Sequence, residues 1–396
     1  MVRDTKRAVR VLMLRFSVAV MTMVLLAACA HQDIDIGQEA DEIVTARMIL
    51  ESSPLGDGGA GQDVSRVDML ELSPEMIAFL EEEIDIVRDK RGMLTRLGWA
   101  VIKSGKFELS YDESTQTATE TFESRKGNCL SFTNMFIAMA RHLGINAYFQ
   151  EVNLPPVWSL SGQSYIFNQH INVYARLDQG FDQVIDFNQF EIDLDHDTRL
   201  ISDDRARAHY HNNIGVEQML AGDPLLAYLN LKESLLRDGT YAPAWINMGI
   251  LHRRQGLYRW AEAAYLEALE LEPGNLMALS NLTSLYRAQG MEGLSERYME
   301  KVQRHRMQNP YYRFHKANAA FSQGDYDTAI KDLKYAIRHQ RDEDRFCYLL
   351  SLSYLMNGDR EAALKWMEKA ESLAQEKSTR EKYSLKLEML QNLSQH

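Results

Sequence analysis

The chain has 396 residues, and its 56 Asp and Glu against 44 Lys and Arg give a formal net charge of −12 at pH 7. This acidic balance argues against a nucleic-acid-binding protein, because the phosphate backbone requires a basic surface. With 45% apolar residues, 25% charged residues and only 8 Pro, the composition is that of a globular protein with two or three domains. Its three cysteines, Cys29, Cys129 and Cys347, cannot form a disulfide framework and match no zinc or redox spacing.

Residues 1–28 have the pattern of a bacterial signal peptide. Five basic residues and one acidic residue precede Phe16, and the run of 13 residues from there to Ala28 carries no charge. This run is shorter than the roughly 20 residues that a membrane-spanning helix needs. It ends in Leu-Ala-Ala-Cys at 26–29, which resembles a lipobox. The resemblance implies cleavage before Cys29 and acylation of its thiol, which would anchor the protein to a membrane. An ordinary signal peptide or an uncleaved anchor is the alternative.

The residues after the expected cleavage site indicate a cell-envelope protein with a folded part beyond a tether. Ala30 stands where an Asp would indicate inner-membrane retention, so we expect the periplasmic face of the outer membrane. Residues 29–72 are acidic and poor in pattern, which predicts a tether. Ser-Pro-Glu at 73–75 predicts the start of a helix. From 73 to 204, helical stretches mix with short alternating strands, which predicts an α+β domain.

The C-terminal half is repetitive. Small residues recur at fixed distances from a glycine, which lets two antiparallel helices approach closely while the glycine makes the turn. The period resembles the tetratricopeptide repeat, with residues 242–275 as the best copy. The resemblance implies an all-α solenoid of five repeats over 205–377 and a capping helix over 378–396. The five glycines, each 34 residues apart, are Gly222, Gly256, Gly290, Gly324 and Gly358.

In the geometry of this repeat family, the first helix of each repeat lines a concave groove. The groove positions include Arg253, Arg254 and Arg287, with Phe314 and Phe321 beyond them. Basic side chains beside aromatic ones in an acidic chain predict a site for an acidic or C-terminal segment of a protein partner. A solvated face, or a groove filled by the N-terminal domain, is the alternative.

Cys129 occupies a position that suits a reactive thiol. Gly-Asn-Cys at 127–129 precedes an apolar run that ends at Gly144, which predicts a buried helix with Cys129 at its N-terminus. The free N–H groups and the dipole of a helix N-terminus favour a thiolate over a thiol. The sequence therefore predicts a nucleophile at this point of the chain.

Two strands downstream of Cys129 carry the groups that would complete such a site. Residues 169–175 and 183–188 alternate in polarity, which predicts a hairpin. If the hairpin turns about Gln179, Asp186 faces Asn172 and lies on the same face as His170. The carboxylate can then orient the imidazole, and the imidazole can take the thiol proton.

Residues 75–195 resemble the bacterial transglutaminase-like fold, which is related to papain-type cysteine enzymes. The resemblance rests on the Gly-Asn-Cys motif, on the helix that follows it, on His170 in a strand and on Asp186 in the next. It implies a Cys129, His170 and Asp186 triad that acts on peptide or side-chain amide bonds of a peptide or protein substrate and needs no cofactor. Ile-Asn follows His170 instead of the usual Ala-Trp, and Phe181 and Val184 stand where a Trp is often found.

The sequence leaves the reaction open between hydrolysis and acyl transfer. An intact triad favours an enzyme of either kind. The alternative is a non-catalytic lipoprotein scaffold that keeps the transglutaminase-like fold and binds protein partners through its repeats. The substrate and the oligomeric state are not indicated by any motif.

No metal site is expected. Residues 193–197 resemble the start of a calcium loop, but the sixth position is Thr198 instead of Gly and the twelfth is Asp204 instead of Glu. His209 and His211 are two residues apart on a predicted helix and so face different ways. We therefore expect a solvated linker at 193–197.

Overall fold

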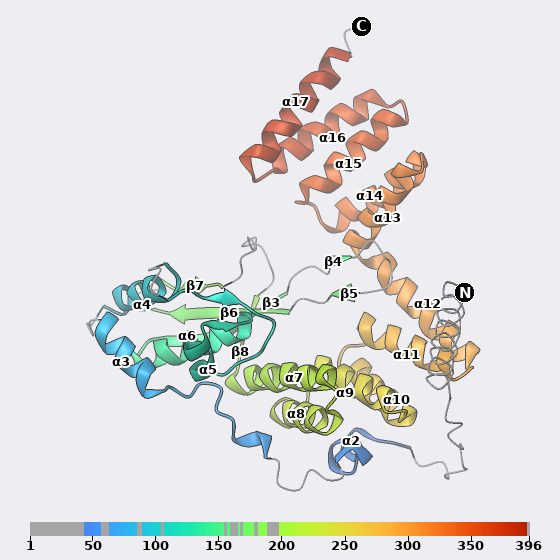
Figure 1. Ribbon diagram of the computed structural model, residues 1–396. Helices are drawn as coiled ribbons and strands as arrows, with labels where there is room; N and C mark the ends of the chain where they lie inside the picture. The colour runs from blue at the N-terminus through green and yellow to red at the C-terminus, as the bar shows by residue number, and fades with distance from the viewer. Residues whose placement is uncertain are drawn as a thin grey trace, which may run out of the picture. The chain divides into compact units, whose positions relative to one another are not determined.

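The computed structural model describes residues 43–56, 63–84, 89–103, 107–153, 157–158, 165–166, 169–177, 181–187 and 198–393. Val44–His396 form one compact unit, and every contact reported below lies within it. Both helices and short strands occur up to residue 201, and the described residues from 202 to 393 contain helices without strands (Figure 1). In the described part of the chain, no helix has both the length and the apolar character needed to cross a membrane.

The region before residue 202 contains short helices and strands, as its mixed pattern predicts. Helix α3 begins after the predicted Ser73, whose hydroxyl accepts a hydrogen bond from the backbone N–H of Met76. The helical elements are α2 (Ala46–Glu51), η1 (Pro54–Gly56), η2 (Val64–Arg66), α3 (Pro74–Glu83), α4 (Lys90–Gly98), the π-helical η3 (Trp99–Lys103), α5 (Ala118–Ser124) and α6 (Cys129–His142). The strands are β1 (Ser110–Tyr111), β2 (Lys126–Gly127), β3 (Asn146–Asn153), β4 (Val157–Trp158), β5 (Tyr165–Ile166), β6 (Gln169–Arg176), β7 (Gln183–Ile185) and β8 (Thr198–Ile201).

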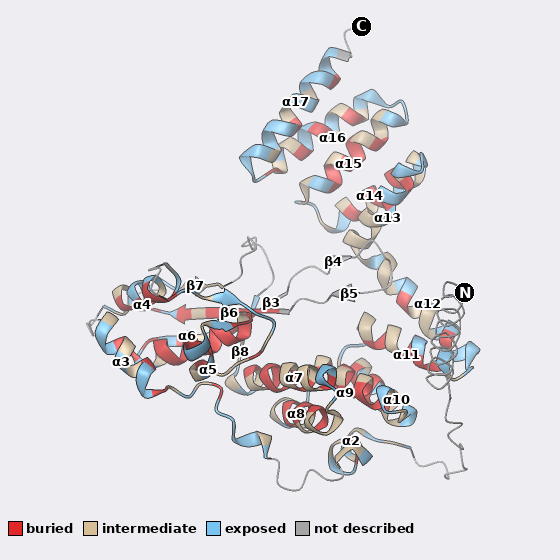
Figure 2. Ribbon diagram, viewed as in Figure 1, coloured by how far each residue is buried: buried red, intermediate tan, exposed pale blue. Residues whose placement is uncertain are grey.

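The main sheet has four antiparallel strands in the order β7-β6-β3-β8. Helix α6 packs against β6 and β3 and is buried over most of its length (Figure 2). Its apolar side chains share one core with Phe149 of β3 and with Ile171 and Val173 of β6. This packing fixes Cys129, the first residue of α6, relative to the strand that carries His170.

Helices α7 to α16 form five consecutive antiparallel pairs in the continuously described stretch 198–393, and α17 follows them. All five predicted glycines have positive φ angles between 70° and 88°, in the left-handed region that glycine adopts without steric cost. The predicted 34-residue helix-pair period is confirmed. The helices are α7 (Asp203–Ala221), α8 (Pro224–Arg237), α9 (Ala242–Arg254), α10 (Tyr258–Leu271), α11 (Leu276–Ala288), α12 (Glu292–Gln308), α13 (Pro310–Ser322), α14 (Tyr326–His339), α15 (Asp344–Met356), α16 (Arg360–Leu373) and α17 (Lys377–Leu393).

The tether expected over 29–72 is packed against the folded part in two stretches. Ile49 is fully buried in the same core cluster as residues of α8 and α10, and its carbonyl accepts a hydrogen bond of 2.9 Å from the hydroxyl of Tyr228. Farther along, Met69 is buried, and its carbonyl accepts from the N–H of Ala118 at 2.9 Å. The tether prediction is wrong for 43–56 and 63–72, because single apolar residues anchor these segments without any periodic pattern. Residues 29–42 and 57–62 lie outside the described residues.

A buried polar contact also holds the first of these stretches. The Ser53 hydroxyl and Nε2 of His252 lie 2.8 Å apart, and Nδ1 of the same ring bonds the Met248 carbonyl at 2.8 Å. Nδ1 therefore carries the proton, and Nε2 accepts from the serine. Burial lowers the pKa of His252 to about 4, which keeps the ring neutral and suited to this role.

Candidate active site

Cys129 begins helix α6, and the residues before it shape the helix N-terminus. The side chain of Asn128 accepts a hydrogen bond of 3.0 Å from the N–H of Ser131, and its amide donates to the Thr115 hydroxyl at 2.8 Å. Gly127 has φ of 150°, and a Cβ there would lie 2.5 Å from Cβ of Ser131. The Gly-Asn pair is therefore required by geometry, since glycine permits the close approach and asparagine caps the helix.

His170 and Asp186 meet across the hairpin of β6 and β7. Val173 pairs with Ile185 and Ala175 with Gln183, which confirms the predicted register about Gln179. Nε2 of His170 lies 2.7 Å from Oδ1 of Asp186. The amide of Asn172, directly opposite, donates to Oδ2 of the same carboxylate at 3.0 Å. Both carboxylate oxygens are therefore engaged, which fixes the plane of the carboxylate against the imidazole.

The thiol of Cys129 interacts with the imidazole of His170. Burial lowers the pKa of His170, but hydrogen bonds with Asp186 and Cys129 and the charges of both groups outweigh burial and raise the pKa to about 9. Because Asp186 occupies Nε2, Nδ1 is the ring nitrogen left for the thiol. Cys129 is partly exposed, so that a substrate can reach it.

Tyr111 is a further ionisable group beside the thiol. Strand β1 pairs with β2 in parallel, which sets Tyr111 opposite Gly127, two residues before Cys129. Burial raises the pKa of Tyr111, and the negative charge of Cys129 raises it further. The tyrosine therefore stays protonated near the thiol and can donate a hydrogen bond there.

A cavity of about 650 Å³ is lined by Cys129 together with residues of β3, β6, β8 and of the first helices of the first three repeats, α7, α9 and α11. The volume is typical of ligand-binding pockets in proteins. From the sheet side, Glu151, Ile171 and Arg199 contribute to the wall. The first helices of three repeats therefore line the same cavity as Cys129.

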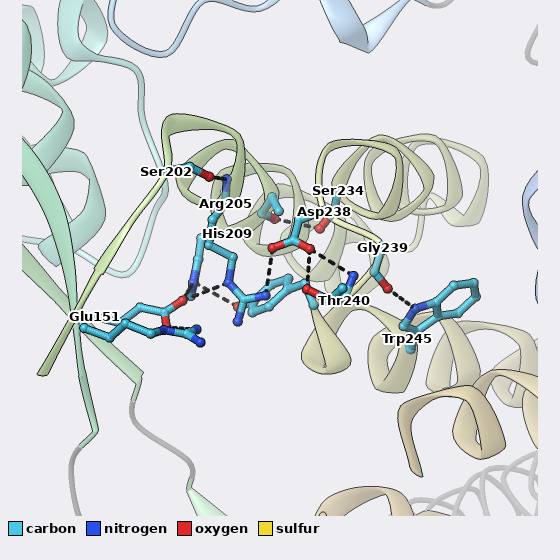
Figure 3. Close-up of polar contacts among 12 residues, drawn as sticks. Glu151, Ser202, Arg205, His209, Ser234, Asp238, Gly239, Thr240 and Trp245 are labelled. Atoms are coloured by element: carbon cyan, nitrogen blue, oxygen red, sulfur yellow. Dashed lines mark hydrogen bonds and ion pairs between the residues drawn. The ribbon is translucent and has the colours of Figure 1, made fainter. Parts of the chain in front are cut away.

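Glu151 of β3 joins the sheet to the first repeat (Figure 3). Its carboxylate accepts hydrogen bonds from Nε of Arg205 at 2.9 Å, from Nη2 of Arg199 at 2.6 Å and from Nε2 of His209 at 2.7 Å. Only 5% of the Glu151 side chain is exposed, against 63% of that of Arg199. The buried part of this cluster therefore consists of Glu151, Arg205 and His209, with Arg199 at its rim.

The charge state of the cluster follows from its contacts. Burial raises the pKa of Glu151, but hydrogen bonds from His209 and Arg205, together with the charge of Arg205, outweigh burial and hold that pKa well below its usual range. Burial lowers the pKa of His209, whose neutral ring donates from Nε2 to Glu151 and accepts at Nδ1 from the hydroxyl of Tyr241 at 2.9 Å. A carboxylate and a guanidinium therefore form the buried ion pair, with the histidine as a neutral bridge.

Several of these residues were not singled out from the sequence. His209 and His211 do face different partners, Glu151 and the side chain of Asn230, as their spacing predicts. The ion pair of Glu151 with Arg205 joins residues 54 positions apart, and no local pattern marks either of them. The one signal in the sequence was Glu151 itself, a charged residue within a strand whose other residues alternate in polarity.

The predicted groove residues divide into two groups. Arg254 and Arg287 are exposed and Arg253 is half-buried, and none of the three lines the cavity beside Cys129. Phe314 and Phe321 pack against the core of the fourth and fifth repeats. Phe314 stacks on Phe346, with ring centroids 4.9 Å apart. Both phenylalanines are partly buried, and the ring of Phe321 lies 5.5 Å from that of Tyr326 in the same repeat, so their role in partner binding stays a prediction.

Two further predictions concern residues that the structure leaves out. Cys29 lies outside the described residues together with the lipobox. The same holds for residues 193–197, which resemble the start of a calcium loop.

Near the triad, Phe181 is 54% exposed and Val184 is 50% exposed. The aromatic contacts at this end of the site come instead from Phe187, whose ring lies 5.8 Å from that of Phe132.

Comparisons with known proteins identify two parts of the chain. A family model described as the transglutaminase-like superfamily matches residues 84–175, and tetratricopeptide-repeat models match 242–275 and 314–377. The first repeat match has the same bounds as the copy chosen from the sequence. No curated protein matches the chain.

Solved structures are similar to part of the chain at low TM-scores. MamA residues 41 to the end from Desulfovibrio magneticus RS-1 is 19% identical, with 42% of this chain and 94% of that one covered and a TM-score of 0.24. YrrB, described as a TPR protein with an unusual peptide-binding site, is 17% identical over 44% and 89%, with a TM-score of 0.24. The APC/C hetero-tetramer Cut9–Hcn1 is 19% identical over 42% and 34%, with a TM-score of 0.25. The chain thus contains a transglutaminase-like core domain and, C-terminal to it, tetratricopeptide repeats.

Proposed function

We propose that the protein is a cysteine-dependent enzyme that acts on peptide or side-chain amide bonds, with Cys129 as nucleophile, His170 as acid and base, and Asp186 as the group that orients the imidazole. The observation that carries this proposal is the 2.7 Å bond from His170 to Asp186, with the imidazole interacting electrostatically with a thiol that lies at a helix N-terminus and opens to a cavity. Acyl transfer through a covalent intermediate requires a nucleophile, a base and a group that orients the base, arranged in that order.

The steps follow from the positions of these groups. The Cys129 thiolate attacks the amide carbonyl carbon and forms a C–S bond, and the negative charge moves to the carbonyl oxygen. Protonated His170 gives its proton to the leaving nitrogen as the C–N bond breaks, which releases an amine and leaves a thioester. Water or an amine then attacks the thioester while His170 takes a proton from it. The C–S bond breaks, and the thiolate is restored without any cofactor.

The repeats supply a surface that can bind a protein partner.

The second part of the proposal is the location of the protein. From the resemblance to a lipobox, we infer an envelope lipoprotein that is anchored through Cys29 and has its folded part facing the periplasm. An acylated N-terminal cysteine with two or more chains gives stable membrane attachment, whereas one chain does not. The anchor would hold the transglutaminase-like domain close to substrates and partners of the envelope.

The enzyme proposal is tested by an electrophilic thiol probe. We expect iodoacetamide at pH 7 to label Cys129 at least roughly tenfold faster than Cys347 in the full-length protein, with sites read by mass spectrometry. Cys347 is a built-in control, because it is fully buried and burial raises its pKa to about 11. In a His170→Ala variant the advantage of Cys129 should disappear. Equal labelling of both cysteines in the parent protein would favour the non-catalytic scaffold instead.

The location proposal has its own test. Metabolic labelling with palmitate should mark the parent protein, and Cys29→Ser should remove the label and release the protein from the membrane fraction. The matched control is Cys347→Ser, which should keep both the label and the membrane attachment. Recovery of Cys29→Ser wholly in the membrane pellet would contradict the lipid anchor.

A further inference from the structure

We propose that the cavity beside Cys129 is the binding site for an extended polypeptide segment, held between the sheet of the transglutaminase-like domain and the first helices of the repeats. This inference rests on the proposed enzyme function and deepens it, because it assigns the substrate class and the residues that bind it. In this arrangement the repeats bind the substrate of the thiol in their own chain.

The composition of the wall opposite the thiol favours a peptide. Asn213 and Asn247 line the cavity from α7 and α9 and stand 34 residues apart, at equivalent positions of the first two repeats. Asn247 donates from Nδ2 to Asn212 at 2.8 Å, and Asn213 accepts from Asn212 at 3.4 Å. Within the described residues, these contacts leave the side-chain oxygen of Asn247 and the side-chain NH₂ group of Asn213 without a protein partner. One acceptor and one donor therefore face the cavity, as recognition of a peptide group requires.

The charges of the lining argue against an anionic ligand. Glu151 of the wall is satisfied by Arg205 and Arg199, and Arg205 also bonds Asp238 at 3.0 Å. No excess positive charge is thus left in this cluster to hold a phosphate. The apolar part of the wall consists of aliphatic side chains and a proline, which suit the side chains of a peptide. These residues are Leu130, Ile171, Pro243, Ile246 and Met277.

The spacing of the walls also suits an extended chain. Helices α7 and α9 are neighbours, and packed helices lie roughly 8–10 Å apart. About three residues of extended polypeptide span that distance. A segment that runs across the first helices toward Cys129 would thus meet the amides of Asn213 and Asn247 in turn.

The two walls are held in place by direct bonds. Glu217 of α7 accepts from the N–H of Thr115 at 2.9 Å, in the loop that Asn128 anchors beside the thiol. The guanidinium of Arg141, near the end of α6, forms two bonds of 2.7 and 2.8 Å with Asp203 at the start of α7. The position of the repeat wall relative to Cys129 is therefore set within the fold, and a bound segment is presented to the thiol without further assembly.

The experiment measures how the rate of labelling at Cys129 depends on peptide length. The probes are randomised mixtures of capped hexapeptides and of capped dipeptides, each carrying a chloromethyl ketone at the C-terminus or a chloroacetyl group at the N-terminus. Randomised sequences are suitable because side-chain amides recognise the peptide backbone. In the full-length parent protein we expect hexapeptides to label Cys129 roughly tenfold faster than dipeptides in at least one orientation.

The variants separate substrate binding from thiol reactivity. The Asn213→Ala, Asn247→Ala double variant should lose the length advantage while its rate with iodoacetamide stays at the parental value. Met277→Trp, which fills the cavity with bulk, should lose it as well. Asn281→Ala is the matched control, since Asn281 is the next residue in the same 34-residue series but does not line the cavity. A parent protein without any length advantage, or a double variant that keeps it, overturns the inference. If Cys129 of the parent protein does not react with iodoacetamide, the proposed enzyme function is overturned instead.

Discussion

Replacement of Cys129 by alanine should abolish formation of the acyl-enzyme and with it all turnover of an amide substrate. No other group in the site can form the C–S bond on which the reaction depends. The measurement is trapping of the thioester by mass spectrometry, alongside steady-state turnover. Cys347→Ala is the matched control and should keep parental turnover, because Cys347 lies in the core of the last repeat. Parental turnover in Cys129→Ala would end the enzyme interpretation.

The other two members of the site should rank below Cys129 in a fixed order. His170→Ala removes both the base for the thiol and the acid for the leaving amine, and such groups contribute roughly 10²- to 10⁴-fold to rate. Asp186→Ala should cost less, because the carboxylate only orients the imidazole and favours its protonated form. All three variants should melt close to the parent, since the core of α6 and the sheet is untouched. A larger loss in Asp186→Ala than in His170→Ala would contradict these roles.

The pH profile separates an orienting role for Asp186 from a structural one. Protonated His170 is needed to release the amine, and the raised pKa of about 9 keeps it protonated at neutral pH. The acylation rate should therefore fall as the pH rises through about 9. Asp186→Ala removes a contact that raises the pKa of His170, so the alkaline fall should move to lower pH. A variant with reduced rate but an unmoved alkaline fall would indicate that Asp186 acts only through stability.

The parts of the site that are local in sequence were predictable, and the hairpin shows why. Strand alternation and a single turn fix which residues face each other, so the pairing about Gln179 and the approach of Asp186 to His170 followed from spacing. The 34-residue period of glycines likewise reported the backbone geometry directly, because each of these positions requires a positive φ. Both patterns depend on short-range sterics, which a single sequence contains.

The contacts between distant segments were not predictable in the same way. The cavity beside Cys129 is completed by α7, α9 and α11, whose approach to the sheet depends on packing that no repeat position encodes. Phe314 was assigned to a groove by its position in the repeat, and its stacking on Phe346 of the next helix pair could not be inferred from that position. Ile49 and Met69 anchor segments that the sequence predicted to be a tether. A single buried side chain can hold a loop in place, but it produces no periodic pattern of apolar residues by which the loop could be recognised.

Glu151→Gln should destabilise the protein by about 3 kcal/mol, the largest loss we expect from a single isosteric substitution. The side chains of Glu151 and Arg205 are 5% and 11% exposed, so the ion pair is buried. The substitution removes one of the two carboxylates that pair with the buried guanidinium, leaving only Asp238 at 3.0 Å, and turns an NH₂ group toward donors. Because the pKa of Glu151 is held below its usual range, its contribution is fully present at neutral pH and is lost as the pH falls below about 4.

The measurement is the midpoint of the first cooperative thermal transition at pH 7, which should fall by roughly 6–12 °C in Glu151→Gln. Glu51→Gln is the matched control, because Glu51 pairs with Arg47 at 2.8 Å with both side chains more than half exposed. Exposed pairs contribute little, so this control should change the midpoint by about 1–2 °C at most. The two variants differ in burial and not in the chemical change, so their difference isolates the cost of removing a buried carboxylate from its ion pair. Equal midpoints in the two variants would show that the bond between β3 and α7 does not hold the sheet to the first repeat.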